Sequence, residues 1–195
     1  MPRTIGIGLI GFGWMGHAHA RSYRSIPAYF PEAGIRPRLV AVADTDTARV
    51  EDAVANHGFE SGTDDYRRLL ERDDIAVIDV TAPNGMHEEL ATAAAAAGKH
   101  VFCEKPVGVD PFATARIEAA ARRAGVITGG GYNYRWAPLV QYLRGLIAEG
   151  RLGELTHYRG RFFTMYGRDR LGLLNWRFLL EEGGYGVLND VMPHV

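Results

Sequence analysis

The chain has 195 residues, of which 47% are hydrophobic and 23% are charged, and its formal net charge is −1. This composition is typical of a globular domain, and the small net charge gives no general attraction to nucleic acid or to an anionic membrane. Cys103 is the single cysteine, which excludes a disulfide within the chain. The first apolar run, Ile5 to Ile10, is too short to span a bilayer or to form the core of a signal peptide. We therefore expect a cytoplasmic protein with no nucleic-acid or membrane partner.

Short apolar runs alternate with helix-like segments over the first two thirds of the chain. Strands are predicted at residues 5–10, 39–43, 75–80, 100–103 and 126–128. Helices are predicted at residues 15–25, 47–57, 88–97 and 111–124, where Asp46 or Thr47 and Asp110 are suitable N-caps and Gly58, Gly98 and Gly125 suitable ends. Strands that are apolar throughout and separated by helices indicate a parallel sheet covered on both faces. The fold class predicted is therefore α/β, with a doubly wound, Rossmann-type sheet.

The pattern changes after about residue 130. Pro138 begins a predicted helix with one apolar stripe, and residues 155–165 alternate in the manner of a long strand. An irregular loop is expected at 166–175, and a helix beginning at Val187. We therefore predict two units: residues 1–130, the doubly wound domain, and residues 131–195, the incomplete start of a second, α+β domain.

A glycine motif, Gly11-Phe12-Gly13-Trp14-Met15-Gly16, joins the first predicted strand to the first helix. Gly11 permits a tight turn, Gly13 lets the backbone approach a pyrophosphate, and Gly16 lets the helix pack against the strand. The pyrophosphate then lies at the N-terminus of the helix. The string alone is a weak indication, but its place between a strand and a helix favours a dinucleotide site.

Asp44 follows the second predicted strand. A carboxylate at this point accepts the hydroxyls of an adenosine ribose and repels a 2′-phosphate, which favours NAD over NADP. Its distance from Gly16 exceeds the usual ~20 residues, and the excess is assigned to an extended connection at residues 28–38. Helix capping is the alternative role for Asp44. Arg49 leaves NADP possible, although an exposed helix arginine is the simpler interpretation.

Two further groups have side chains suited to catalysis. Lys105, in Glu104-Lys105-Pro106, follows a strand at the edge of the sheet where ligands bind, and its ammonium can hydrogen-bond a reacting oxygen. Asp190 and His194 are four residues apart, so on a helix they would share a face, and a histidine oriented by a carboxylate is a suitable general base. The alternatives are a surface lysine and a local surface pair.

These motifs occur in an order that resembles the Gfo/Idh/MocA oxidoreductases, the family of glucose–fructose oxidoreductase and inositol dehydrogenase. The resemblance covers essentially the whole chain. It rests on residues 11–16, Thr81-Ala-Pro-Asn-Gly-Met-His87, Gly98-Lys-His-Val-Phe-Cys-Glu-Lys-Pro106 and Gly183-Gly-Tyr-Gly-Val-Leu-Asn-Asp190 with His194.

The resemblance implies an NAD(P)-dependent oxidoreductase acting on a hydroxyl of a sugar, polyol or inositol-like substrate. It implies that Lys105 positions the reacting oxygen, that His194 is the acid/base and that Asp190 assists it. The Lys-Pro bond is often cis in this family. The implied cofactor contacts are residues 11–16 together with Asp44, Thr81, Pro83, Asn84, His87, Glu104, Lys105 and Asn133. The implied substrate contacts are Lys105, Arg135, Trp176, Arg177 and His194; no metal is implied.

Two departures from the family pattern bear on these expectations. Met192 stands where a glycine is usual, and Pro193 lacks an N–H, so a regular helix through His194 is not expected. Family members also continue well beyond this histidine into a broad sheet, through which they usually form homo-oligomers. We therefore expect a C-terminally truncated form whose 155–165 strand lacks its sheet neighbours. The alternatives are a non-catalytic dinucleotide-binding module and, ranked last, a glycine-loop methyltransferase.

Overall fold

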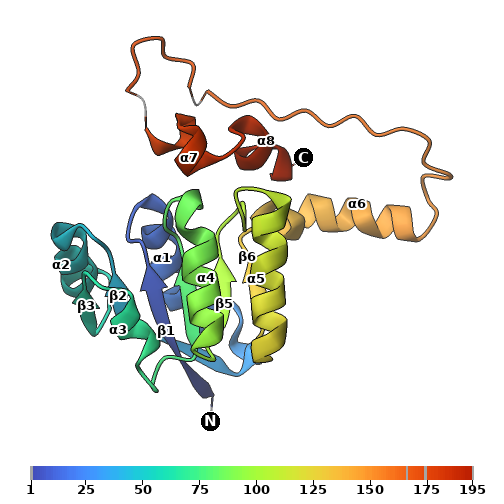
Figure 1. The fold of residues 1–195 in the computed structure, drawn as a ribbon. Helices are drawn as coiled ribbons and strands as arrows, with labels where there is room; N and C mark the ends of the chain where they lie inside the picture. Colours follow the sequence, from blue (N-terminus) through green and yellow to red (C-terminus); the bar gives the residue numbers. More distant parts are fainter. Residues whose placement is uncertain (1, 166, 174, 195) are drawn as a thin grey trace.

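A computed structural model describes residues 2–165, 167–173 and 175–194 of the protein. Its centre is a six-stranded parallel sheet with the strand order β3-β2-β1-β4-β5-β6 (Figure 1). The strands are β1 (Arg3–Ile10), β2 (Ile35–Ala43), β3 (Ser61–Thr63), β4 (Val77–Val80), β5 (His100–Cys103) and β6 (Thr128–Gly130). The order reverses direction beside β1, as in a doubly wound sheet, so the predicted fold class is confirmed.

Helices cover both faces of the sheet. Those on the faces are α1 (Trp14–Tyr29), α2 (Thr47–Asn56), α3 (Arg67–Leu70), α4 (His87–Ala96) and α5 (Pro111–Ala124). The helices that follow are α6 (Pro138–Ala148), α7 (Leu180–Gly183) and α8 (Val187–Asp190). The 3₁₀ turns are η1 (Pro31–Ala33), η2 (Asn84–Met86), η3 (Asn133–Trp136), η4 (Trp176–Phe178) and η5 (Met192–His194). No helix among the described residues combines the length and apolarity needed to cross a membrane.

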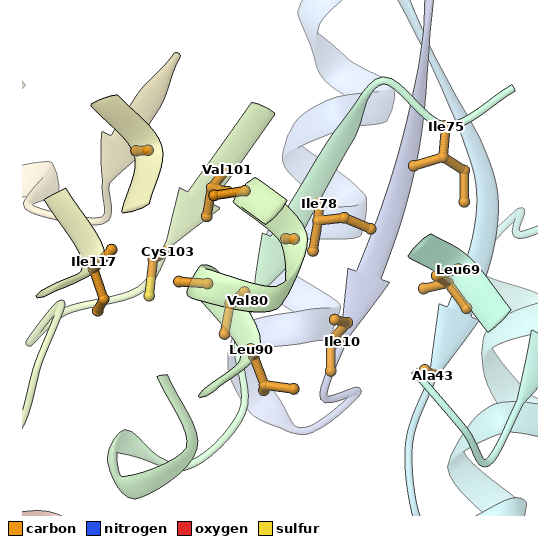
Figure 2. Close-up of a cluster of buried hydrophobic side chains, with 14 of the residues drawn as sticks. Ile10, Ala43, Leu69, Ile75, Ile78, Val80, Leu90, Val101, Cys103 and Ile117 are labelled. Atoms are coloured by element: carbon orange, nitrogen blue, oxygen red, sulfur yellow. The ribbon is translucent and has the colours of Figure 1, made fainter. Parts of the chain in front are cut away.

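The core consists of two apolar clusters, one on each face of the sheet. Side chains of α3, α4 and α5, including Leu69, Leu90 and Ile117, pack on one face (Figure 2). On the other face, α1 and α2 pack their small residues Ala20 and Ala53 against the strands. Burial of each large aliphatic side chain contributes about 1.5–3 kcal/mol, so these clusters hold the strand ends in fixed positions.

Polar caps set the predicted helix boundaries. Asp46 accepts the N–H of Ala48 at 3.0 Å at the start of α2, and Asp110 accepts that of Ala113 at 2.7 Å at the start of α5. Gly125 ends α5 with φ at 66°, a left-handed conformation that glycine adopts without strain. Of the two cap candidates for α2, the structure therefore selects Asp46.

Two local predictions are wrong. The segment 28–38 is not one extended connection, because α1 runs to Tyr29 with Pro27 inside it, η1 follows, and β2 begins at Ile35. The short strand β3 was not predicted, since three residues are too few to show a hydrophobic period and Ser61–Thr63 gains its place only by pairing with β2.

The C-terminal third differs from the prediction at residues 155–165, and residues 166 and 174 of the loop expected at 166–175 lie outside the described residues. Helix α6 begins at Pro138 as expected, but residues 155–165 form no strand. A strand requires a neighbouring backbone to satisfy its N–H and C=O groups, and the sheet of the described residues includes no strand from this segment. The Phe162 ring lies instead 5.7 Å from that of Tyr134 and 5.9 Å from that of His194. The chain then returns, and α7 and α8 lie over the edge of the sheet where the strands end (Figure 1).

Candidate active site

The glycine loop between β1 and α1 leaves room for a ligand at one glycine only. Gly11 has φ at 93°, and a Cβ there would lie 2.7 Å from Cα of Ala82. A Cβ on Gly16 would lie 2.6 Å from the carbonyl oxygen of Gly11. At Gly13, by contrast, the nearest atom to a Cβ is Arg49 Nη1 at 4.0 Å. Gly11 and Gly16 therefore permit close packing of the protein itself, whereas Gly13 borders open space at the helix N-terminus, where an anion is favoured.

Asp44 ties the end of β2 to this loop. One carboxylate oxygen accepts the N–H of Phe12 at 2.6 Å, and the other accepts that of Asp46 at 2.9 Å. The side chain is 7% exposed, and Arg49 Nη1 lies 3.7 Å from it. Each carboxylate oxygen has a second lone pair available for a ribose hydroxyl. In NADP a 2′-phosphate takes the place of one ribose hydroxyl, and Arg49 is a cation beside Asp44 that would face it.

The segment that follows β4 is held by buried polar contacts. The hydroxyl of Thr81 donates to the carbonyl of Gly11 at 2.5 Å, and Asn84 donates to the carbonyl of Gly183 at 3.4 Å. His87 is fully buried, with its ring nitrogens 2.7 Å from the carbonyl oxygen of Pro106 and 2.9 Å from that of Ala82. Its burial lowers its pKa.

This segment therefore braces the loops around the candidate site. The side chains of Asn84 and His87 hydrogen-bond backbone carbonyl groups of neighbouring loops. Their predicted contact with a cofactor stays a prediction. Pro83, which precedes η2, lies in the same turn.

Lys105 projects from the turn after β5 towards α8. Its Nζ lies 2.5 Å from Oδ1 of Asp190 and 2.8 Å from the backbone carbonyl of the same residue. The Lys105–Pro106 peptide bond is cis, as the family resemblance implied. The carboxylate of Glu104 points into the protein, and the residue is 7% exposed. This orientation does not favour the predicted contact with the cofactor, which stays a prediction.

Asp190 and His194 do not share a helix. Helix α8 ends at Asp190 and the turn η5 carries His194, in agreement with the expected effect of Pro193. The Asp190 carboxylate pairs with Lys105, and its other oxygen lies 3.9 Å from Nε of Arg177. Asp190 thus contacts the lysine directly, and its predicted role of assisting His194 stays a prediction.

The His194 ring lies on the same side of the sheet edge as Lys105. Its centroid is 4.5 Å from that of Tyr134, and its Nδ1 is buried without a hydrogen bond to any residue that the structure describes. Burial, followed by the nearby positive charge of Lys105, lowers the pKa of His194. The ring is therefore neutral at neutral pH, the form that accepts a proton.

The other predicted substrate contacts lie around this group. Arg135 is exposed on η3, beside Asn133, which was predicted to contact the cofactor and is also exposed. The guanidinium of Arg177 stacks 4.2 Å from the ring centroid of Trp176 on η4. Sequence reasoning missed His19 and Asp79, which lie beneath Glu104. The available indication was a charged residue inside the apolar run of β4.

Comparison with protein families gives one matching model. It is described as an oxidoreductase family with an NAD-binding Rossmann fold, and it matches residues 5–132.

Among similar proteins, levoglucosan dehydrogenase of Pseudarthrobacter phenanthrenivorans is 34% identical over 193 residues, which is 99% of this chain and 50% of the relative. Inositol 2-dehydrogenase of Salmonella agona is 30% identical over 163 residues, 83% of this chain and 46% of the relative.

Two solved structures resemble the chain closely. Levoglucosan dehydrogenase in complex with NADH and levoglucosan has a TM-score of 0.95 at 34% identity, covering 99% of this chain and 52% of that one. An NAD-binding oxidoreductase from Klebsiella pneumoniae has a TM-score of 0.91 at 40% identity, covering 98% and 51%. The chain therefore spans about half the length of the curated relatives it matches.

Proposed function

The chain belongs to the Gfo/Idh/MocA family of NAD-binding oxidoreductases, and from this premise we propose that it binds NAD(H) and serves hydride transfer to or from a hydroxyl carbon of a sugar or polyol. The observation that carries the proposal is the meeting of Lys105, Asp190 and His194 beside the open glycine loop. Residues 1–130 would hold the cofactor, and residues 131–195 would contribute to the substrate side.

The loop geometry fits a dinucleotide. The open space at Gly13, the helix N-terminus behind it and the carboxylate of Asp44 correspond to the needs of a pyrophosphate and a ribose. Asp44 disfavours a 2′-phosphate, so NAD is the proposed cofactor. Arg49, 3.7 Å from the Asp44 carboxylate, is a group that favours NADP.

The catalytic residues have separate tasks in the proposed reaction. The ammonium of Lys105 donates a hydrogen bond to the reacting oxygen and stabilises the negative charge that develops there. His194 accepts the hydroxyl proton during oxidation and returns it during reduction. Asp190 holds the ammonium in place between these events. The nicotinamide, when bound, supplies the hydride acceptor or donor.

The substrate class follows from the same residues. Arg135, Trp176 and Arg177 would line the side of the site away from the cofactor, and an arginine stacked on an indole ring offers donors to hydroxyl oxygens and an apolar face to a carbon ring. The named relatives act on levoglucosan and inositol. A cyclic polyhydroxy compound is therefore the first class to test.

The test combines cofactor binding with turnover. NADH binding is measured by fluorescence titration, and NAD reduction is followed over a panel of hexoses, anhydrosugars and inositols. We expect Lys105→Met and His194→Gln to lower turnover by at least about 100-fold, the usual contribution of a positioned acid–base group, with little effect on the Kd for NADH.

His57→Gln is the matched control, because it makes the same change at a histidine of the α2 region, which pairs with Asp52 at 3.1 Å and not with the candidate catalytic residues. It should leave both quantities unchanged. Cofactor binding without turnover on any substrate would favour the non-catalytic module, and absence of NADH binding would overturn the proposal for this chain.

A further inference from the structure

A charged cluster lies inside the cofactor domain, beneath the turn that carries Lys105. Asp79 occupies the middle of β4 and is fully buried. Its Oδ2 lies 2.8 Å from Nδ1 of His19 on α1, and the other ring nitrogen of His19 lies 3.2 Å from Oε1 of Glu104. His19 thus bridges two carboxyl groups that come from different strands.

With both carboxyl groups ionised, the bridge requires both ring nitrogens of His19 to donate. A carboxylate offers acceptors only, so both contacts are made when the ring carries both protons. Burial alone would lower the pKa of His19, but the hydrogen bonds and charges of Asp79 and Glu104 raise it to about 10. Burial raises the pKa of Asp79, which His19 opposes. The hydroxyl of Tyr23 faces the same carboxyl group.

Such an arrangement is costly unless it is complete. Removal of one partner from a buried ion pair leaves an uncompensated charge and destabilises a protein by about 3–5 kcal/mol. Oδ1 of Asp79 makes no hydrogen bond to a described residue. The Tyr23 hydroxyl faces this carboxyl group, and His19 is the charged group that compensates it. An apolar core at this point would serve the fold without that cost, which indicates a task beyond packing.

Glu104 connects the cluster to the candidate catalytic lysine. Its Oε1 meets His19, and its Oε2 accepts the backbone N–H of Lys105 at 3.2 Å. The opposite wall is Gly131, where a Cβ would lie 2.2 Å from Oε1 of Glu104. The Glu104 side chain is therefore fixed between an imidazolium and a glycine backbone, and the backbone of Lys105 is fixed to it.

We propose that His19, Asp79 and Glu104 form a buried positioning cluster that fixes the backbone of Lys105, so that its ammonium is aimed at the reacting oxygen. This inference rests on the proposed function of Lys105 but concerns residues that touch neither cofactor nor substrate. Without the charge of His19, the carboxylate of Glu104 loses its partner and turns away from the N–H of Lys105. His19 and Asp79 are thus positioning residues.

The composition of the chain makes a direct test possible, because Lys99 and Lys105 are its only lysines. Labelling lysine Cε with ¹³C gives one NMR cross-peak for each, and Lys99→Arg assigns them. Lys99 lies at the other end of β5, where its Nζ donates to the carbonyl of Arg72. It is an internal reference within the same domain, and the readout requires no cofactor, substrate or turnover.

The decisive variant is His19→Gln combined with Asp79→Asn. The single change His19→Gln leaves Asp79 uncompensated and should lower Tm. The double variant removes both charges and should regain Tm, yet Glu104 still lacks its imidazolium partner. We expect the Lys105 cross-peak to be displaced by more than its linewidth in both, while the Lys99 peak stays in place. His57→Gln should move neither peak.

The outcomes separate the two roles. If the double variant regains Tm and the Lys105 peak returns to its wild-type position, the cluster serves stability alone and the proposal is overturned. A Lys105 peak that stays displaced in the refolded double variant supports it. Failure of the proposed function appears elsewhere, as absent NADH binding or turnover in the unaltered chain, so the two failures are distinguishable.

Discussion

Replacing Gly13 by valine separates cofactor binding from folding. Gly13 has φ −85° and ψ −159°, an extended conformation that valine adopts, and a Cβ there would meet only Arg49 Nη1 at 4.0 Å. Valine is a poor N-cap, so we expect a stability cost below about 1 kcal/mol, which lowers Tm by at most about 2–4 °C. The same side chain would occupy the space proposed for the pyrophosphate.

The expected loss of affinity follows from the contacts that the side chain would block. A hydrogen bond to a charged group contributes about 1.5–3 kcal/mol. Each loss of about 1.4 kcal/mol in binding free energy raises the Kd tenfold, so the loss of one such contact weakens NADH binding by roughly 10- to 150-fold. Fluorescence titration measures the Kd, and thermal unfolding of the same samples measures Tm.

Two further glycines calibrate the result. Gly145→Ala, in an open position of α6, should leave the Kd unchanged. Gly11→Ala should lower Tm more than Gly13→Val, because a Cβ there meets the backbone of Ala82 at 2.7 Å and φ is positive. An unchanged Kd for a folded Gly13→Val protein would refute the assignment of the pyrophosphate to this loop.

Three other predictions follow from the site and its supports. Asp44→Ser should shift the preference from NAD towards NADP by at least about tenfold, since it removes a carboxylate beside Arg49. An unchanged ratio of the Kd for NAD to the Kd for NADP would contradict this. Burial lowers the pKa of His194 from 6.5, and the proton acceptor is the neutral ring. In a pH–rate profile the oxidation rate should therefore fall only as the pH drops through a midpoint below 6.5. A midpoint above 6.5 would exclude His194 as the base in this environment. Asp110→Ala removes the 2.7 Å cap of α5 and should cost about 1 kcal/mol by denaturant unfolding, without a change in the Kd for NADH.

The residues of the proposed catalytic group could be selected from the sequence, but their contacts could not. Lys105, Asp190 and His194 follow from the motifs and their order along the chain. The pairing of Asp190 with Lys105 does not, because it depends on how α8 folds back across the sheet edge. The spacing of four residues suggested a pairing of Asp190 with His194, but Pro193 already argued against a regular helix there, and α8 ends at Asp190.

Burial explains the other differences at the site. His87 and Glu104 are polar residues in motif positions, which favours ligand contact when only their order is known. In the structure His87 is enclosed between two carbonyl groups and Glu104 faces His19. No local pattern distinguishes a polar residue that faces a ligand from one that faces the protein interior.

The sequence by itself determined the alternation of strands and helices, the caps at Asp46 and Asp110 and the glycine loop, because each depends on residues close together in the chain. Only the tertiary structure decided the pairing of β3, the absence of a strand at 155–165 and the cluster of His19, Asp79 and Glu104. The pairing and the cluster depend on which backbone or charge lies alongside across 20 to 85 residues of sequence separation. Local chemistry set the elements, and long-range packing set the partners of their polar groups.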